Sequence, residues 1–80
     1  MASMSLIVVK AAYDPEAGVW YVESSDIDGL NLEASSIEQL REKLPGAILD
    51  LIEGERGVDL DIPIELIAHT STRLRASGRA

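Results

Sequence analysis

The first third of the chain contains two stretches rich in β-branched residues, at residues 5–13 and 19–24. Such stretches are typical of β-strands. Between them lies a five-residue segment, DPEAG, with the residues of a tight turn. Asp14 suits the first position of a type I turn, Pro15 fixes φ at the second, and Gly18 accepts the positive φ that closes the loop. The pattern therefore predicts an antiparallel hairpin.

A second turn and a third strand follow the hairpin. Residues 25–29 (SDIDG) combine turn-forming aspartates with Gly29, and residues 30–34 (LNLEA) then alternate apolar with polar side chains. Alternation of this kind is typical of a strand with one buried face. The first 34 residues are therefore expected to form a three-stranded meander.

A helix is predicted from Ser35, which forms a capping box with Glu38 three residues later. Gly54 is expected to end this helix, because glycine favours the position just after a helix C-terminus. At about 100° per residue, the apolar side chains of this segment share one arc of roughly 140°. The residues in this arc are Ile37, Leu40, Leu44, Ala47, Ile48, Leu51 and Ile52.

Three residues depart from this helical pattern. Arg41 falls inside the apolar arc, whereas Leu49 lies outside it and is predicted to face a partner chain. Pro45 falls in the helix interior, where it removes one backbone hydrogen bond at a cost of about 3 kcal/mol. We expect a kink there, and a break at Leu44 remains open.

The last strand is predicted over residues 61–68, with Pro63 favouring an edge position because it has no N–H to donate to a ladder. A right-handed crossover through the helix would place this strand parallel to the first. The expected fold class is α+β with element order β-β-β-α-β and sheet order 3-2-1-4. The predicted domain spans residues 5–69, and residues 70–80 are expected to form a flexible basic tail.

Chain length and net charge limit the classes of function that the protein can have. Eighty residues form one small domain, which buries only about 60% of its unfolded surface, so self-association into a dimer or tetramer is expected to add stability. The net charge is −7, and residues 1–70 contain all 14 acidic residues but only four basic ones. Such a surface repels phosphate backbones, so direct nucleic-acid binding by the core is not expected. A basic protein partner would be steered towards it.

The chain contains no cysteine, which excludes disulfide scaffolds, thiolate zinc sites and thiol nucleophiles. The early apolar run of residues 6–9 is too short for a signal peptide core or a membrane span. We therefore expect a soluble, cytoplasmic protein that binds neither a membrane nor a small-molecule substrate.

Catalytic groups are sparse, so we predict that the protein is not an enzyme and has no cofactor. His69, the single histidine, is expected to be an ordinary strand-end residue, because no nucleophile or orienting acid can be tied to it. Residues 24–29 partly resemble a calcium loop, but serine occupies positions one and twelve. No acid lies in residues 5–13 to begin the two-metal chemistry of ribonuclease H.

An exposed sheet surface is predicted on the side away from the helix. Trp20 and Tyr21 point to opposite faces of the second strand, so one of them lies on that uncovered side. An aromatic and several aliphatics on an open sheet favour dimerisation or partner docking there. The alternative is a single exposed aromatic with no role.

Three segments together resemble the DUF1902 group of HicB-like proteins: residues 9–22 (VKAAYDPEAGVWYV), 25–30 (SDIDGL) and 40–45 (LREKLP). The resemblance covers roughly residues 5–69 and is most specific in the hairpin. It implies a partial ribonuclease H-like fold without nuclease function, like the antitoxin halves of HicA–HicB type II toxin–antitoxin modules. The implied partner is a small basic RNA-cleaving toxin of double-stranded-RNA-binding fold that uses a histidine.

The chain departs from that family pattern in two ways. Asp28 stands where the wider family usually has proline in its Asp-x-Pro-Gly turn. The 80 residues also contain no counterpart of the carboxy-terminal DNA-binding domain of full-length HicB proteins, so promoter autoregulation is not expected.

The leading hypothesis is a non-catalytic antitoxin-like module that neutralises a basic HicA-like toxin by covering its RNA-binding face. Trp20 or Tyr21 would supply an apolar anchor. The acidic contacts would come from Asp14, Glu16, Glu23, Asp26 and Asp28. The alternatives are an orphan homo-oligomeric scaffold or regulator with no toxin, and a metal-dependent hydrolase.

Overall fold

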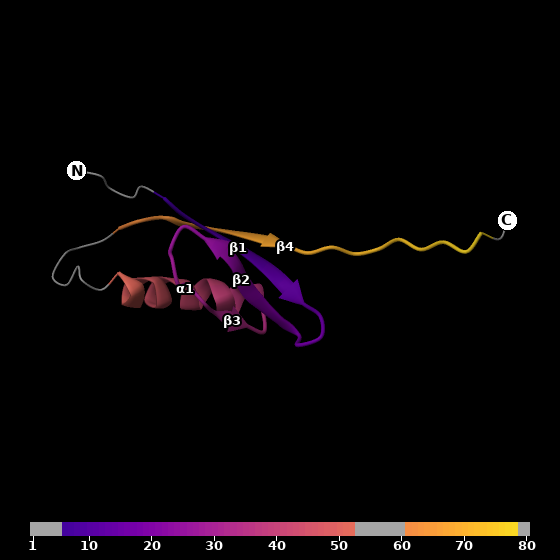
Figure 1. Cartoon of the computed structure of the whole chain (residues 1–80), viewed down its shortest axis with the longest axis horizontal. Helices are drawn as coiled ribbons and strands as arrows, with labels where there is room; N and C mark the ends of the chain where they lie inside the picture. Colours follow the sequence, from indigo (N-terminus) through magenta and orange to yellow (C-terminus); the bar gives the residue numbers. More distant parts are fainter. Residues whose placement is uncertain (1–5, 53–60, 79–80) are drawn as a thin grey trace.

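The fold is described in a computed structural model that covers residues 6–52 and 61–78. One helix packs on one side of a four-stranded sheet of order β3-β2-β1-β4. The elements are β1 (Ile7–Asp14), β2 (Val19–Ser25), β3 (Glu33–Ala34), α1 (Ile37–Leu51) and β4 (Ile64–His69). Strands β1 and β2 are antiparallel, whereas β1 and β4 are parallel. Figure 1 shows this arrangement, which confirms the predicted α+β fold and its strand order.

The β1–β2 hairpin closes through Asp14, as its sequence predicts. The Asp14 carbonyl accepts a hydrogen bond from the Gly18 N–H at 2.7 Å, and Asp14 Oδ1 accepts one from the Glu16 N–H at 3.0 Å. Gly18 has a φ of +70°, which a residue with a side chain rarely adopts. The turn therefore depends on Asp14 and Gly18 together.

Strand β2 contains an irregularity that the sequence pattern did not indicate. Lys10 pairs with Ser24, but the next residue, Ala11, pairs with Val22. Glu23 is therefore an extra residue on β2, as in a β-bulge, and the strand twists more strongly there. As a consequence, the side chains of Glu23 and Ser24 are both directed to the same side of the sheet.

The third strand is shorter than predicted. The alternation over residues 30–34 indicated five residues, whereas β3 contains only Glu33 and Ala34, which pair with Tyr21 and Trp20. The Leu30 N–H donates to the Ile27 carbonyl at 3.4 Å, so the start of this segment belongs to the preceding turn. The apolar residues of the segment still pack on the core, which explains why they alternate.

The helix begins one residue later than the predicted cap. Ser36, not Ser35, is the N-cap, and its Oγ accepts a hydrogen bond from the Gln39 N–H at 3.1 Å. Both serines have an acidic or amide residue three positions later, so the sequence motif fits either register. Ser35 instead donates from its Oγ to Gln39 Oε1 at 2.8 Å.

Helix α1 continues through Pro45 without a break. Pro45 is exposed, so the carbonyl that loses its hydrogen bond is on the side of the helix that water reaches. Leu49 is 52% exposed, as predicted. Leu51, by contrast, was placed in the apolar arc but is 46% exposed at the last helical position, where its side chain lies near the Gly29 turn. The expected helix end at Gly54 lies outside the described residues.

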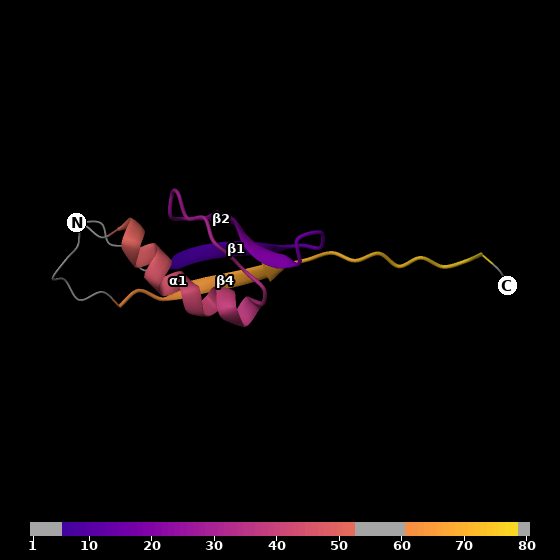
Figure 2. The ribbon, with the colours of Figure 1, turned by 90° about the horizontal axis from the view of Figure 1, so that it is seen from below.

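The core lies between α1 and the face of the sheet that it covers. Leu40, Leu44 and Ile48 on the helix are almost fully buried. They pack in two clusters with Ile7, Val9, Ile27, Ala11 and Ala34. Figure 2 shows α1 crossing along the strands, and because it is the one helix of the described residues, the opposite face of the sheet has no covering helix among them.

The cap assignment predicts a difference between the two serines. Ser36→Ala should lower the free energy of unfolding by about 1 kcal/mol, because the Gln39 N–H loses its acceptor. Ser35→Ala should lower it by less than about 0.5 kcal/mol, since its exposed hydroxyl bonds only to another side chain. Urea denaturation followed by circular dichroism measures both. Equal losses would contradict the assignment.

Candidate docking face

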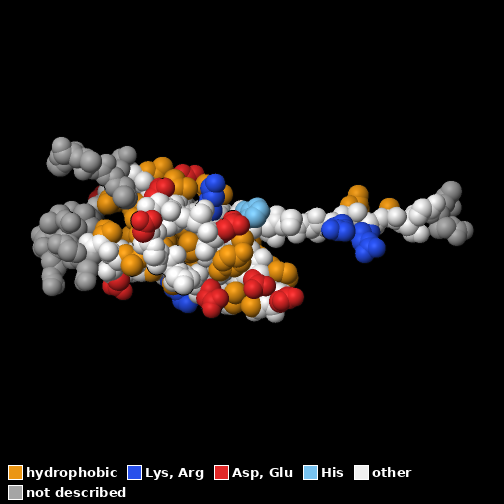
Figure 3. Space-filling model, in the orientation of Figure 1, with side chains coloured by type: hydrophobic (Ala, Val, Ile, Leu, Met, Phe, Trp, Pro, Cys, Tyr) orange, Lys and Arg blue, Asp and Glu red, His pale blue; other side chains and the backbone are white. Residues whose placement is uncertain are grey.

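The uncovered face of the sheet has a mixed apolar and acidic surface. Strand pairing places Tyr21 beside Ala12 and Glu33 on this face, and Ile67 beside Lys10. Tyr21 is 37% exposed and Ile67 is 40% exposed. The charged and polar residues on the same face are Lys10, Glu23, Ser24, Glu33, Glu65 and His69. Figure 3 shows this side of the molecule, where an acidic side chain (red) lies against the single histidine (pale blue).

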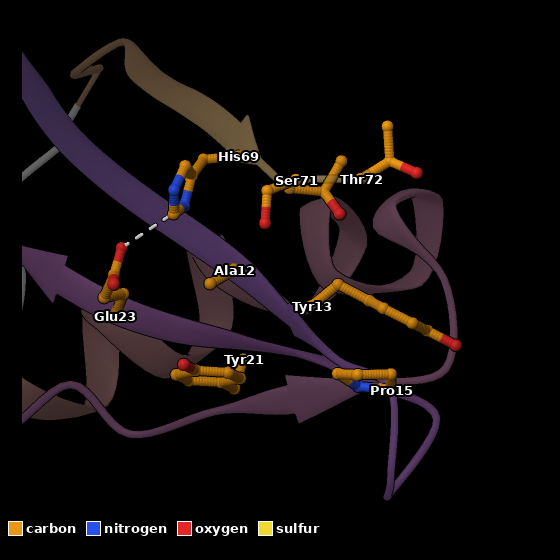
Figure 4. Close-up of a pocket in the computed structure, with 9 residues that line it drawn as sticks. Ala12, Tyr13, Pro15, Tyr21, Glu23, His69, Ser71 and Thr72 are labelled. Carbon is orange, nitrogen blue, oxygen red and sulfur yellow. Dashed lines mark ion pairs between the residues drawn. The ribbon is translucent and has the colours of Figure 1, made fainter. Parts of the chain in front are cut away.

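An open hollow of about 600 Å³ lies on this face where β1 and β4 end. His69 Nδ1 and Glu23 Oε1 are 3.7 Å apart across it, and their side chains are 63% and 46% exposed. Figure 4 shows the pair above Tyr21, with residues 71 and 72 along the upper rim. Sequence analysis predicted His69 as a strand-end residue, and it is the last residue of β4. A water-exposed ion pair of this kind adds little stability.

The two candidate aromatic anchors have different surroundings. Trp20 is half-buried on the helix side, where it packs against the cluster of Ala34 and Leu40. Its ring is 5.1 Å from that of Tyr13 at an interplanar angle of 54°. Tyr21 is the aromatic on the open face. Of the two anchors proposed from the sequence, Tyr21 is therefore the one available for docking on this face.

The five predicted acidic contacts do not form one cluster. Asp14 and Glu16 belong to the β1–β2 turn, whereas Asp26 and Asp28 follow the other end of β2. Only Glu23, at the bulge, lies beside Tyr21 in the hollow. The two turns lie at opposite ends of the same strand, so their carboxylates are separated by the length of β2.

Two of these acids bond to the protein's own backbone. Asp26 Oδ2 accepts a hydrogen bond from the Val8 N–H at 2.9 Å, and the Asp26 N–H donates to the Val8 carbonyl at 3.1 Å. The side chain thereby extends the β1–β2 ladder beyond Ser25. Asp14 Oδ1 similarly holds the first turn. Glu16 and Asp28 are exposed.

Sequence reasoning missed three residues of the open face: Glu33, Glu65 and Ile67. It also missed that His69 lies beside Glu23. The alternation of side chains between the two faces of a strand was the sequence signal that could have indicated these residues. Glu33 pairs with Tyr21, and Glu65 pairs with Val8. Locating them required the register of β3 and β4, which the sequence did not provide.

The described residues contain no group of three histidine or carboxylate side chains arranged to hold a metal ion. Asp26 and Asp28, the central acids of the calcium-like loop, lie in a turn, and Asp26 Oδ2 is bonded to the Val8 N–H. Within the same residues, no helix has the length and apolar character needed to cross a membrane.

The chain was compared with known proteins. A family model described as "Domain of unknown function (DUF1902)" matches residues 6–77. No curated protein matches. Among solved structures, the chain is similar to hypothetical protein TTHA1013 from the extremely thermophilic bacterium Thermus thermophilus, with 41% identity and a TM-score of 0.60. That match covers 89% of this chain and 99% of the other.

The hydrogen bonds of the second turn predict different stability effects for substitutions of its two acids. Asp26→Ala should lower the free energy of unfolding by about 1 kcal/mol, because the Val8 N–H loses a charged acceptor. Asp28→Ala, at an exposed position, should change it by less than about 0.5 kcal/mol. Urea denaturation at constant pH measures both. An unchanged stability for Asp26→Ala would show that its carboxylate has no structural role.

Proposed function

The chain belongs to the DUF1902 family, and we propose that it acts as a non-catalytic, antitoxin-like binding module. Its partner would be a small basic RNA-cleaving toxin of the HicA-like class, which it neutralises by covering the RNA-binding face. The observation that supports this proposal is the open sheet face, on which an exposed tyrosine and isoleucine lie among three glutamates.

The chemistry of that face suits a basic protein surface. Tyr21 and Ile67 are apolar groups left in water, and tyrosine is among the residues that most often anchor protein interfaces. Glu23, Glu33 and Glu65 lie on the same face and present carboxylates in place of phosphates. A basic surface that binds an RNA backbone would meet negative charge here, as it does on the phosphates, and this attraction favours fast association with the face.

Self-association without a toxin is the second candidate function. It is favoured by β4, whose outer edge has no neighbouring strand in the described sheet. Self-association would use the outward backbone groups of β4, whereas docking would use the side chains around Tyr21 and Glu23, and residues 69–72 border both surfaces.

Co-purification with the tagged full-length chain from its native host separates the two functions. We expect a small basic protein that cleaves RNA, and whose cleavage stops when the chain is added back. Recovery of the chain alone, or of a partner that is neither basic nor active on RNA, would contradict the antitoxin proposal.

With that basic protein as the probe, charge reversal tests the docking face. Glu23→Lys with Glu33→Lys should slow association about tenfold at low salt and reduce its salt dependence. The matched control is Glu38→Lys with Glu42→Lys, two exposed acids on the helix. This control should stay within about twofold of the original rate. Stopped-flow association kinetics measures both, and equal effects of the two pairs would assign the binding to net charge and not to this face.

A further inference from the structure

The free edge of β4 presents unpaired backbone groups at regular intervals. The Pro63 carbonyl accepts from the Ile7 N–H at 3.0 Å, so Pro63 and the odd-numbered residues after it direct their backbone groups towards β1. The backbone groups of Ile64, Leu66 and Ala68 therefore point away from the sheet. A strand edge of this kind is a template for pairing with another strand.

We propose that a second copy of this chain pairs antiparallel with β4 around a two-fold axis through Ile67. In this register Ile67 lies opposite its own counterpart, and Glu65 lies opposite His69 of the other copy. Just beyond the strand, Asp61 lies opposite Arg73. Glu65, Ile67 and His69 are on the open face, and each of the two pairs occurs twice because of the symmetry.

The backbone supports the same register. Leu66 would exchange hydrogen bonds with Ala68, and Ile64 with Thr70, all of them residues whose groups point outwards from β1. Pro63 falls at a position that makes no bond to the partner, so its missing N–H costs nothing. Glu65 and His69 face each other at a non-hydrogen-bonded position, where opposing side chains are closest.

Neighbouring registers lack this match. An axis through Leu66 places Glu65 opposite Ile67, and an axis through Ala68 places His69 opposite Ile67. An axis through Glu65 places two carboxylates against each other. Of these four arrangements, only the axis through Ile67 places Glu65 opposite His69 and Asp61 opposite Arg73.

The tail supports a second copy as the occupant. Residues 70–78 continue from β4 as an extended, exposed segment that leaves the body of the molecule, as Figure 1 shows. The family model extends to residue 77, so most of this tail belongs to the matched domain. Its arginines are opposite in charge to the acidic body. The antiparallel arrangement directs Arg73 towards the Asp61 end of the partner's β4.

Apolar surface beside β4 is consistent with the same interface. Two adjoining grooves of about 190 and 450 Å³ run between α1 and β4. Both are lined by Pro45 and Ile64, and Leu66 and Leu49 border one each. In the two-fold arrangement the helices of both copies are on the same side of one continuous sheet, so these grooves border the interface. This inference rests on the edge of β4 and its register and not on the proposed function, although residues 69–72 also line the hollow beside Tyr21.

Charge exchange between Asp61 and Arg73 tests the register with the full-length chain. Sedimentation velocity should show a dimer for the original chain. Asp61→Arg alone and Arg73→Asp alone should each raise the dimer dissociation constant about tenfold, since two attractive pairs become repulsive. An equimolar mixture of the two variants should dimerise again, because every pair across the mixed dimer has opposite charge. Both positions are exposed and outside the strand, so the fold is unaffected.

The control for Asp61→Arg is Glu42→Arg, which makes the same change in net charge on an exposed helix position and should leave dimerisation unchanged. Ala68→Pro removes an outward N–H without removing a bond to β1 and should give a monomer. A monomeric original chain at concentrations up to about 500 µM would overturn the proposal. The proposal would also be overturned if the single charge variants dimerised normally or if their mixture stayed monomeric. An effect of Glu42→Arg equal to that of Asp61→Arg, or a dimeric Ala68→Pro variant, would overturn it as well.

Discussion

A single helix covers one face of the sheet, and the rest of the structure depends on this one-sided packing. Fifteen helical residues span about 22 Å, enough to bury the inward side chains of the central strands. Leu40, Leu44 and Ile48 form that contact. Because the described residues contain no second helix for the opposite face, most side chains of the strands that point away from α1 are exposed, and Ala12 is the buried exception.

The open face is shaped by local features of β2. The extra residue at Glu23 directs consecutive polar side chains to the same side, and Tyr21 precedes them on that side. Glu23 therefore lies close enough to His69 to form an ion pair between two strands that are not neighbours in the sheet. The acidic turns at the two ends of β2 have another part in the structure, since Asp14 and Asp26 each bond to backbone N–H groups.

The parallel crossover through α1 explains why β4 is an edge strand. This connection places β4 beside β1 at the margin of the sheet, next to the flank of α1 and the grooves along it. The open face and the free edge are the two surfaces of the described residues on which the proposals rest. The proposed docking would use side chains of the open face and the proposed two-fold pairing the backbone edge of β4, and residues 69–72 border both.

The sequence by itself determined the elements and their order. Asp14 and Gly18 specify the hairpin turn, the apolar arc specifies the buried side of the helix, and the handedness of the crossover specifies sheet order 3-2-1-4. These features depend on a few residues close in sequence or on general rules of chain geometry. Membership of the DUF1902 family, expected from three short segments, is confirmed by the match to residues 6–77.

Only the tertiary structure decided which cap serine is used, how short β3 is, and which acids share the open face. Ser35 and Ser36 both fit the capping motif, and the choice depends on where β3 ends and delivers the chain to the helix. Nothing in the sequence distinguishes Glu33 and Glu65 from the other acidic residues. Strand register alone places Glu33 beside Tyr21 and Glu65 beside Val8. Register depends on contacts between residues distant along the chain, so a local pattern of apolar and polar residues cannot specify it.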